Sequence, residues 1–270
     1  IAEIIMLAIS FTQISPIAFE ILGFEVYWYS LAYIFGTILG YALLKHLNKQ
    51  TSLFTNQSME DLIFYSILGI IIGGRLGYMI FYDFESILSD PIKIFKIRDG
   101  GMSFHGGLLG MIISTYLFCR KYKISLLQAT DHISVVATIG LFLGRVANFI
   151  NQEMYGKVTA APWGVVFPMA GPLPRHPTQL YEALLEGFFL LLILYILFPK
   201  LHHRKGAISG MFLIIYGIFR IFIENYKDAT DGHIWILTTG QALSIPMIIL
   251  GSILLKRSGN KMKAIDINKY

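Results

Sequence analysis

Long apolar segments constrain the fold of this chain more than any other feature. A helix needs about 20 predominantly apolar residues to cross the hydrocarbon core of a bilayer, and seven segments reach or approach that length. They cover residues 26–44, 62–82, 104–119, 131–150, 179–198, 208–225 and 236–255. Only 14% of the 270 residues are charged, compared with about 25% in an average soluble domain. We therefore expect an all-α integral membrane protein, with residues 1–270 forming one domain of seven transmembrane helices.

The basic residues predict how this bundle is oriented. Cytoplasmic loops of membrane proteins are enriched in Lys and Arg. If the seven spans alternate in direction, thirteen Lys and Arg lie on one side of the membrane, six lie on the other, and three lie within spans. We therefore expect the N-terminus outside, on the periplasmic side, and the C-terminus in the cytoplasm. Membrane orientation also explains the net charge of +5 better than nucleic-acid binding does.

Three segments outside the spans have predicted roles. Residues 1–25 contain polar residues and Pro16, so we expect an interfacial N-terminal arm instead of a span. Residues 83–103 and 151–178 are predicted to be external loops. The second of these loops holds five of the nine prolines and is predicted to form a small external cap.

The end of the fourth predicted span is unusually polar. Arg145, Asn148 and Gln152 are spaced at i, i+3 and i+7, so they share one helical face, and Asn151 and Glu153 flank it. An Arg inside an apolar span costs roughly 2.5–3.5 kcal/mol on insertion scales, so it rarely lacks a partner or a function. A structural ion pair is one explanation, but the polar groups here exceed what one pair needs.

Other spans bring polar side chains to the same predicted depth, in the half of the membrane that faces outward. The residues at this depth are Tyr29, Arg75, His105, Arg145, Asn148, Glu153, Gln179, Arg220 and Glu224. Three arginines are more positive charge than the nearby glutamates need for structure. Because guanidinium groups bind phosphate bidentately, and a phosphate at this depth belongs to a phospholipid, the sequence predicts a phospholipid site facing the outer leaflet.

The Arg220–Glu224 pair and His105 have simpler explanations that stay open. Tyr216, Arg220 and Glu224 repeat at i+4 on one helical face, so Arg220 and Glu224 could form a self-neutralising pair. His105 follows a glycine-rich stretch at the start of a span, and a single histidine there could be structural. The glycines would let a substrate or another backbone approach closely.

The polar segment also carries a sequence resemblance. The pattern Gly144-Arg145-x-Ala147-Asn148-Phe149-x-Asn151-x-Glu153-x-x-Gly156 resembles the signature of the bacterial prolipoprotein diacylglyceryl transferases. Further motifs similar to this family are Tyr27-Trp28-Tyr29, Gly73-Gly74-Arg75, His105-Gly106-Gly107, His176-Pro177-x-Gln179-Leu180-Tyr181-Glu182, Tyr216-Gly217-x-x-Arg220-x-x-x-Glu224 and Gly240-Gln241-x-x-Ser244-x-Pro246-Met247. Together they cover roughly residues 11–256.

The resemblance implies a specific reaction. An enzyme of this family transfers the diacylglyceryl group of phosphatidylglycerol to the lipobox cysteine thiol of a prolipoprotein signal peptide. The products are a thioether and glycerol 1-phosphate, and this is the first step of bacterial lipoprotein maturation. The resemblance therefore implies a multi-pass protein of the cytoplasmic (inner) membrane, with its active site facing the outer leaflet and with no nucleic-acid partner.

The same resemblance and the chemistry of the side chains suggest a role for each candidate residue. The thiol has an unperturbed pKa of about 8.5, so His105 is the candidate base. The predicted catalytic residues are His105, Arg145, Arg220 and Tyr29. The predicted phosphatidylglycerol-binding residues are Arg145, Asn148, Arg220, Tyr216, Arg75 and Gly156. The predicted orienting residues are Glu153, Glu224, Asn151, Gln179 and Glu182. Neither metal-ligand spacing nor a nucleotide-binding loop is present in the sequence, so we expect no metal and no cofactor.

Two other functional classes fit the composition less well. A transporter or channel with arginines along an anion path would have polar residues through the whole membrane depth, but the inner halves of the predicted spans are nearly all apolar. Another outer-leaflet phospholipid enzyme, such as a headgroup hydrolase, would need a nucleophile or a metal, and the sequence offers no clear candidate for either.

Overall fold

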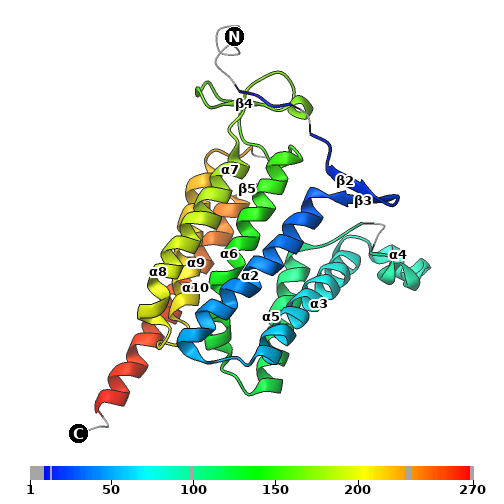
Figure 1. Cartoon of the computed structure of the whole chain (residues 1–270). Coiled ribbons are helices and arrows are strands. Elements are labelled where there is room, and N and C mark those ends of the chain that lie inside the picture. The colour runs from blue at the N-terminus through cyan, green and yellow to red at the C-terminus, as the bar shows by residue number, and fades with distance from the viewer. Residues whose placement is uncertain (1–8, 13, 98–99, 229–232, 268–270) are drawn as a thin grey trace. The chain divides into compact units, whose positions relative to one another are not determined.

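The structure, a computed structural model, describes residues 9–12, 14–97, 100–228 and 233–267. Residues 1–8 and 13 of the predicted arm, and residues 98–99 of the first predicted loop, lie outside this range. Most of the described chain is helical (Figure 1). The chain divides into two compact units: unit 1 comprises Ile1–Leu43 with Thr130–Tyr270, and unit 2 comprises Leu44–Ala129. The single domain over 1–270 stays a prediction.

Six helices in the described part of the chain are long and apolar enough to cross a membrane. They are α2 (Trp28–Thr51), α3 (Asn56–Phe81), α6 (Leu126–Ile150), the helical run Thr178–Leu201, α9 (Ala207–Glu224) and the segment Thr239–Gly259 of α10 (Thr239–Ile267). The remaining predicted span, 104–119, is the helix α5 (Phe104–Tyr122). It is not among the six, because His105, Arg120 and Lys121 lower its mean hydropathy. The count of seven spans and their orientation stay predictions.

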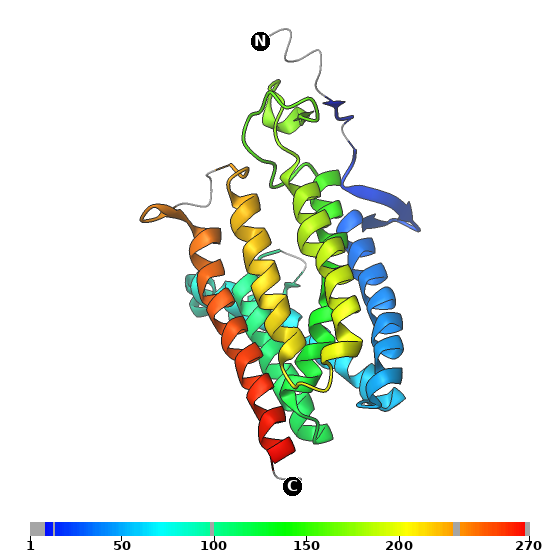
Figure 2. The ribbon, with the colours of Figure 1, turned by 90° about the vertical axis from the view of Figure 1, so that its left-hand side faces the viewer.

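The helical run that begins at Thr178 is not a continuous α-helix. It consists of α7 (Thr178–Glu182), a π-helical stretch η4 (Ala183–Phe189) and α8 (Leu190–Leu201). Figure 2 shows this run in unit 1, together with α9 and α10. π-helical turns are rare and occur frequently at functional sites. Two buried acidic residues, Glu182 and Glu186, lie at the beginning of this stretch and within it.

In unit 2, α3 and α5 pack closely in antiparallel orientation through glycines. Gly69, Gly73 and Gly77 form a small-residue stripe on α3 that faces Gly106 and Gly110 of α5. A Cβ atom added to Gly73 would lie 2.3 Å from the carbonyl oxygen of Gly106, and one added to Gly110 would lie 2.1 Å from that of Gly69. Only glycine allows backbones to approach this closely. The glycines after His105 therefore let the backbone of another helix approach closely. This is one of the two explanations that the sequence offered for them, the other being approach of a substrate.

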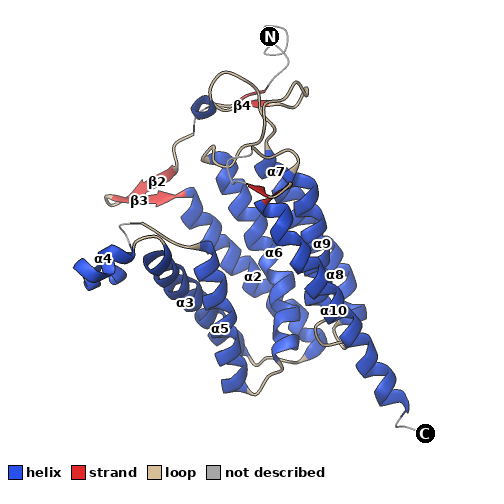
Figure 3. Ribbon diagram, turned by 180° about the vertical axis from the view of Figure 1, so that it is seen from behind, coloured by secondary structure: helices blue, strands red, loops and turns tan. Residues whose placement is uncertain are grey.

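Short strands and helices lie outside the long helices. The strands are β1 (Ile9–Ser10), parallel with β4 (Val165–Val166); β2 (Ile17–Ile21), antiparallel with β3 (Phe24–Tyr27); and β5 (His233–Ile234), antiparallel with β6 (Leu237–Thr238). The short helices are α4 (Phe84–Ser89), η1 (Pro91–Phe95) and η3 (Pro168–Ala170). Figure 3 shows how small the strands are beside the helices. The all-α prediction missed them, because two to five residues are too few to show a hydrophobic period.

A buried carboxylate joins the second turn of α6 to the start of α9. Asp131 is 1% exposed. It accepts hydrogen bonds from the backbone N–H of Gly206 at 2.7 Å, from the N–H of Ser209 at 2.8 Å and from the Ser209 hydroxyl at 2.8 Å. An acidic side chain is well suited to the unsatisfied N–H groups and the positive dipole end at a helix N-terminus. Asp131 therefore acts as a cap for α9, although it belongs to α6.

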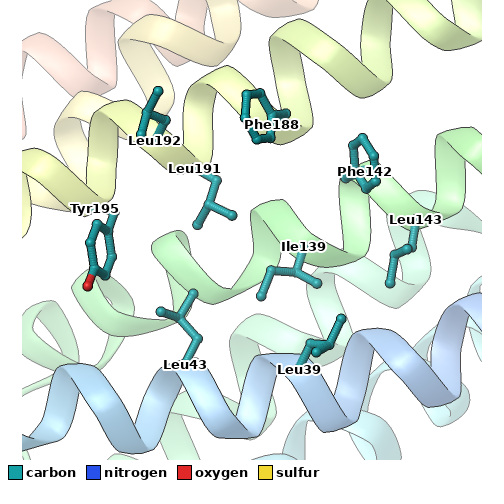
Figure 4. Close-up of a pocket in the computed structure, with 9 residues that line it drawn as sticks. All are labelled: Leu39, Leu43, Ile139, Phe142, Leu143, Phe188, Leu191, Leu192 and Tyr195. Carbon is teal, nitrogen blue, oxygen red and sulfur yellow. The ribbon is translucent and has the colours of Figure 1, made fainter.

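Unit 1 also contains an apolar cavity of about 500 Å³. Its lining comes from α2, α6 and the η4–α8 run, as Figure 4 shows. The lining residues are Leu39, Leu43, Ile139, Phe142, Leu143, Phe188, Leu191, Leu192 and Tyr195. Tyr195 is the only one of these nine residues with an ionisable side chain, so the cavity lining offers few groups for acid–base chemistry.

Candidate functional site

Glu182 is the centre of a charged cluster in unit 1. Its side chain is fully buried, with 0% exposure. Arg145 of α6 places Nε 3.2 Å from Glu182 Oε2, and Arg220 of α9 donates from Nη1 to Oε1. Lys227, just after α9, places Nζ 3.3 Å from the same Oε1. One buried carboxylate therefore holds three cations that come from two different helices and the segment after α9.

Two further carboxylates complete the cluster around Arg220. Glu224 Oε2 lies 3.3 Å from Arg220 Nε, and Glu186 Oε1 lies 3.8 Å from Arg220 Nη1. A Cβ atom added to Gly240 would lie 2.5 Å from Glu224 Oε2, so the lack of a side chain at this position makes room for the carboxylate. In formal charge, the three cations balance the three glutamates, and a cluster this buried would be costly without that balance.

Arg145 also connects this cluster to a second network of hydrogen bonds. Its Nη1 donates to Asn148 Oδ1 at 3.3 Å, and Asn148 Nδ2 donates to the Tyr29 hydroxyl. The Tyr29 hydroxyl in turn donates to Glu153 Oε2, which lies 3.3 Å from Asn148 Nδ2. Four residues predicted from the sequence are therefore in one connected group, and Tyr29 reaches it from α2.

A turn with unusual backbone geometry carries Glu153 into this group. Gln152 and Met154 have positive φ values of 59° and 57°, which are uncommon for residues other than glycine. Gln179 donates from Nε2 to the carbonyl of Glu153, and Thr178 donates from Oγ1 to the carbonyl of Met154 at 2.9 Å. Two side chains at the start of α7 thus hold the turn from outside. Thr178 is the first residue of α7, and no side chain caps this helix from Pro177, the N-cap position.

The two arginines keep part of their hydrogen-bonding capacity. Among the described residues, neither the Nη2 of Arg145 nor that of Arg220 has a partner. The two side chains are 18% and 15% exposed, so they are not sealed from their surroundings. A guanidinium whose Nε and Nη1 are fixed and whose Nη2 is open is pre-oriented toward an anionic ligand.

Three other predicted residues of unit 1 lie close to this cluster. Tyr216 stacks on Phe212, one turn earlier on α9, with ring centroids 5.7 Å apart. The backbone N–H of Asn151 donates to the carbonyl of Ala147 at 2.9 Å, which continues the last turn of α6. A Cβ atom added to Gly156 would lie 2.4 Å from a neighbouring carbonyl oxygen, so glycine is required there for backbone packing. Lipid contacts of Tyr216 and Gly156 stay predictions.

His176 lies beside the site, among aromatic side chains. Its Nδ1 is 3.0 Å from the Tyr181 hydroxyl, which accepts a hydrogen bond from Trp163 Nε1 at 2.8 Å. The imidazole packs on the ring of Tyr226, with centroids 5.1 Å apart. Burial, and then the positive charge of Lys157, hold the pKa of His176 below its ordinary value. His176 is therefore set to remain neutral at neutral pH.

The two remaining predicted residues, Arg75 and His105, belong to unit 2. Arg75 is buried, with 6% exposure, and donates all five of its N–H groups to backbone carbonyls, those of Lys93, Ile94, Lys96, Gly100 and Gly101. His105 is exposed at the start of α5, where its ring contacts Phe104. The lipid contact of Arg75 and the catalytic role of His105 stay predictions.

Sequence reasoning undervalued one member of the cluster. Lys227 was not among the predicted site residues, but it is 5% exposed and paired with Glu182. Its position three residues after Glu224 was the available signal, because i, i+3 neighbours share a helical face. Among the residues that the structure describes, no group of three His, Cys, Asp or Glu side chains could hold a metal ion. The expectation that no metal is needed stays a prediction.

Comparison with known proteins connects this geometry to a family. The family model described as "Prolipoprotein diacylglyceryl transferase" matches residues 16–257. The chain belongs to the prolipoprotein diacylglyceryl transferase family. This match includes Tyr29, the whole Glu182 cluster and both unit 2 candidates. The family resemblance inferred from the motifs is therefore confirmed.

Named relatives in this family match over nearly their full length. A protein of Rickettsia felis is 49% identical over 258 residues, which is 93% of this chain and 100% of its own length. One of Rickettsia typhi is 49% identical over 92% of this chain and 98% of its own length. One of Coxiella burnetii is 45% identical over 91% of this chain and 95% of its own length. Each is named as a phosphatidylglycerol–prolipoprotein diacylglyceryl transferase.

Proposed function

We propose that this protein transfers the diacylglyceryl group of phosphatidylglycerol to the cysteine thiol of a prolipoprotein lipobox. Membership of the prolipoprotein diacylglyceryl transferase family supports the reaction, and so do the names of relatives that match nearly the whole chain. The observation that carries the proposal is the arrangement of Arg145 and Arg220. They come from different helices, share the carboxylate of Glu182 and leave both Nη2 groups open.

The two open Nη2 groups suit the phosphate of the lipid substrate. A phosphodiester has two non-bridging oxygens that share one negative charge, and guanidinium groups bind such oxygens with directed, charge-assisted hydrogen bonds. Because Glu182 already fixes both arginines, little side-chain entropy is lost when a phosphate binds. Asn148 and Tyr29 lie next to Arg145, and they would donate to the substrate in place of their bonds to one another and to Glu153. The lipid is thus recognised at its phosphate by groups already in place.

The reaction then follows from the charge that develops on the phosphate. His105 takes the proton of the acceptor thiol. The thiolate then attacks the carbon of the diacylglyceryl group that is bonded to the phosphate oxygen. A carbon–sulfur bond forms as the carbon–oxygen bond breaks, and the electron pair of that bond leaves on glycerol 1-phosphate. The leaving group gains one negative charge, which the two arginines stabilise. A structure with cations already in place does not need to reorganise at this step.

The proposed substrates require a particular placement in the cell. Phosphatidylglycerol and a secreted signal peptide meet at the outer leaflet of the cytoplasmic membrane, so the site should face the periplasm. Seven spans with a periplasmic N-terminus would place it there, as the distribution of basic residues predicts. A reporter fused after Leu201 should read as cytoplasmic, and one inserted in the 160s should read as periplasmic. The opposite pattern would refute this orientation.

The function is tested with purified protein, labelled phosphatidylglycerol and a lipobox peptide. We expect labelled diacylglyceryl on the peptide and release of glycerol 1-phosphate that depends on the peptide. Release without peptide, at an equal rate, would instead indicate a headgroup hydrolase. Absence of transfer under conditions where a Rickettsia felis relative is active would reject the proposed function.

Two substitutions test the phosphate-binding role. In Arg145→Lys and Arg220→Lys the charge remains but the planar fork is lost, so the transfer rate and the stabilisation by phosphatidylglycerol should both fall. Arg204→Lys is a matched control, because Arg204 bonds Leu255 and Ser258 instead. Two active lysine variants with unchanged stabilisation by the lipid would show that the arginines are structural.

A further inference from the structure

We propose that Arg75 is a positioning residue that acts through His105. It holds backbone carbonyls of Lys93, Ile94, Lys96, Gly100 and Gly101, residues that precede His105 in the chain, against one turn of α3. The inference rests on the proposed function, in which His105 deprotonates the acceptor thiol. It assigns Arg75 a role different from the lipid contact predicted from the sequence.

The contacts of Arg75 show how completely its side chain is used. Nε donates to the carbonyl of Ile94 at 3.2 Å. Nη1 donates to the carbonyls of Gly100 and Gly101, the second at 3.2 Å. Nη2 donates to the carbonyls of Lys93 and Lys96, the second at 3.0 Å. A guanidinium has five N–H groups, so none is left for a phosphate unless a carbonyl is displaced.

The segment itself is shaped to deliver these carbonyls. Lys93 and Ile94 are in the last turn of η1, where the carbonyl of Lys93 also accepts from the backbone N–H of Lys96 at 3.1 Å. Gly100 and Gly101 have φ values of +82° and +79°, a region that favours glycine. The guanidinium therefore binds carbonyls at the end of one short helix and at two consecutive glycines that come shortly before α5.

Neighbouring residues on α3 secure the rest of the connection to α5. The backbone N–H of Ser103 donates to the carbonyl of Gly74 at 2.9 Å. A Cβ atom added to Gly101 would lie 2.4 Å from the ring of Tyr78. Gly74, Arg75 and Tyr78 span a single helical turn, so one short stretch of α3 contacts the loop at three places.

His105 follows Ser103, the last of these anchored residues, by two positions. Ser103 is the N-cap of α5, and its Oγ accepts from the N–H of Gly106 at 3.2 Å. The start of α5 is therefore fixed by the loop before it and by the glycine contacts with α3 after it. His105 makes no hydrogen bond to any described residue that would orient its ring, so its position depends on this backbone.

A double-mutant cycle separates positioning from lipid contact. Arg75→Lys cannot satisfy carbonyls in five directions, and a shift of about 1 Å at a catalytic group can cost on the order of 10²-fold in rate. We expect that loss in kcat with the KM for phosphatidylglycerol nearly unchanged. In a His105→Asn protein, the same Arg75→Lys change should cost less than about 3-fold, because residues that act through one another are not additive. Arg120→Lys, an exposed change on α5, is the matched control.

A second readout and a second variant keep the inference testable if Arg75→Lys folds poorly. Trypsin should cleave after Lys93 or Lys96 faster in Arg75→Lys than in the unchanged protein, because the loop has lost its anchor. Gly101→Ala disturbs the same loop from the other side, through its positive φ and the Tyr78 ring. It should show the same dependence on His105.

Several results would overturn the inference. Losses that multiply in the double mutant, together with a raised KM for phosphatidylglycerol, would make Arg75 a lipid-binding residue. Unchanged trypsin cleavage would show that Arg75 does not anchor the loop. Full activity of His105→Asn would remove the residue through which Arg75 is proposed to act. That result is distinct from a failure of the proposed function, which would appear as no transfer by the unchanged protein.

Discussion

Replacing Glu182 by Gln should disturb the site more than any other single change of similar size. The substitution keeps the shape of the side chain and removes one negative charge. Arg145 Nε at 3.2 Å and Lys227 Nζ at 3.3 Å then lose their carboxylate, and Arg220 retains only Glu224 and the more distant Glu186. A cluster with three cations and three carboxylates becomes one with three cations and two.

The magnitude follows from burial. Glu182 is 0% exposed and Lys227 is 6% exposed at the side chain, so water cannot replace the lost interactions. Removing one member of a buried ionic group typically costs about 3–5 kcal/mol. For a protein of this size, a loss of about 3 kcal/mol corresponds to roughly 6–12 °C in the melting temperature. We also expect a rate loss on the order of 10²-fold, because both arginines lose the group that orients them.

The assay pairs thermal unfolding in detergent with the rate of diacylglyceryl transfer to a lipobox peptide. Phosphatidylglycerol should stabilise Glu182→Gln more than it stabilises the unchanged protein, because its phosphate restores the missing negative charge. Glu186→Gln is the matched control: Glu186 is equally buried, but its ion pair with Arg220 is at 3.8 Å, so its effect should be smaller. A Glu182→Gln protein with normal melting temperature and normal rate would refute the reasoning.

Three further outcomes are expected. His105→Asn should lower the transfer rate on the order of 10²–10⁴-fold while preserving lipid binding, with partial recovery at high pH as the thiol ionises unaided; full activity at neutral pH would make His105 structural. Because burial and Lys157 lower the pKa of His176 in the folded protein, the unfolded chain binds this proton more readily. Stability should therefore be constant above about pH 6.5 and fall as the pH drops below that value, a dependence that urea titrations should find weakened in His176→Asn. Gly240→Ala should push Glu224 away from Arg220 and reduce the transfer rate; an unchanged rate would mean that Glu224 is not needed to orient Arg220.

Much of the fold could be predicted because membrane spans depend on local composition. The apolar segments 131–150 and 208–225 correspond to α6 and α9, since every backbone polar group in a bilayer must be satisfied within its helix. The π-helical stretch Ala183–Phe189 was not predicted, because its apolar residues suit an α-helix equally well. Within it, Gly187 packs closely on α6: a Cβ atom there would lie 2.7 Å from the backbone of Phe142.

The candidate site was predictable where its members share one helix. Arg220 and Glu224 are four residues apart, and Arg145 and Asn148 are three apart, so helical spacing alone indicated each pair. The central role of Glu182 was not predictable in this way. It depends on Arg145, Arg220 and Lys227, which are 37, 38 and 45 residues away in sequence, and only the packed structure brings them to one carboxylate. The five backbone hydrogen bonds of Arg75 could not be predicted either, because their acceptors lie 18 to 26 residues away in sequence.

The buried carboxylate of Asp131 has a consequence for the distant arginines. It ties the second turn of α6 to the start of α9, while Glu182 ties Arg145 and Arg220 much further along the same two helices. At 1.5 Å per residue, the two ties are roughly 20 Å apart along α6. Two ties along the same pair of helices oppose sliding of α6 against α9. They therefore fix the spacing between the two guanidinium groups. A substitution of Asp131 should therefore lower the transfer rate although Asp131 does not contact the substrate.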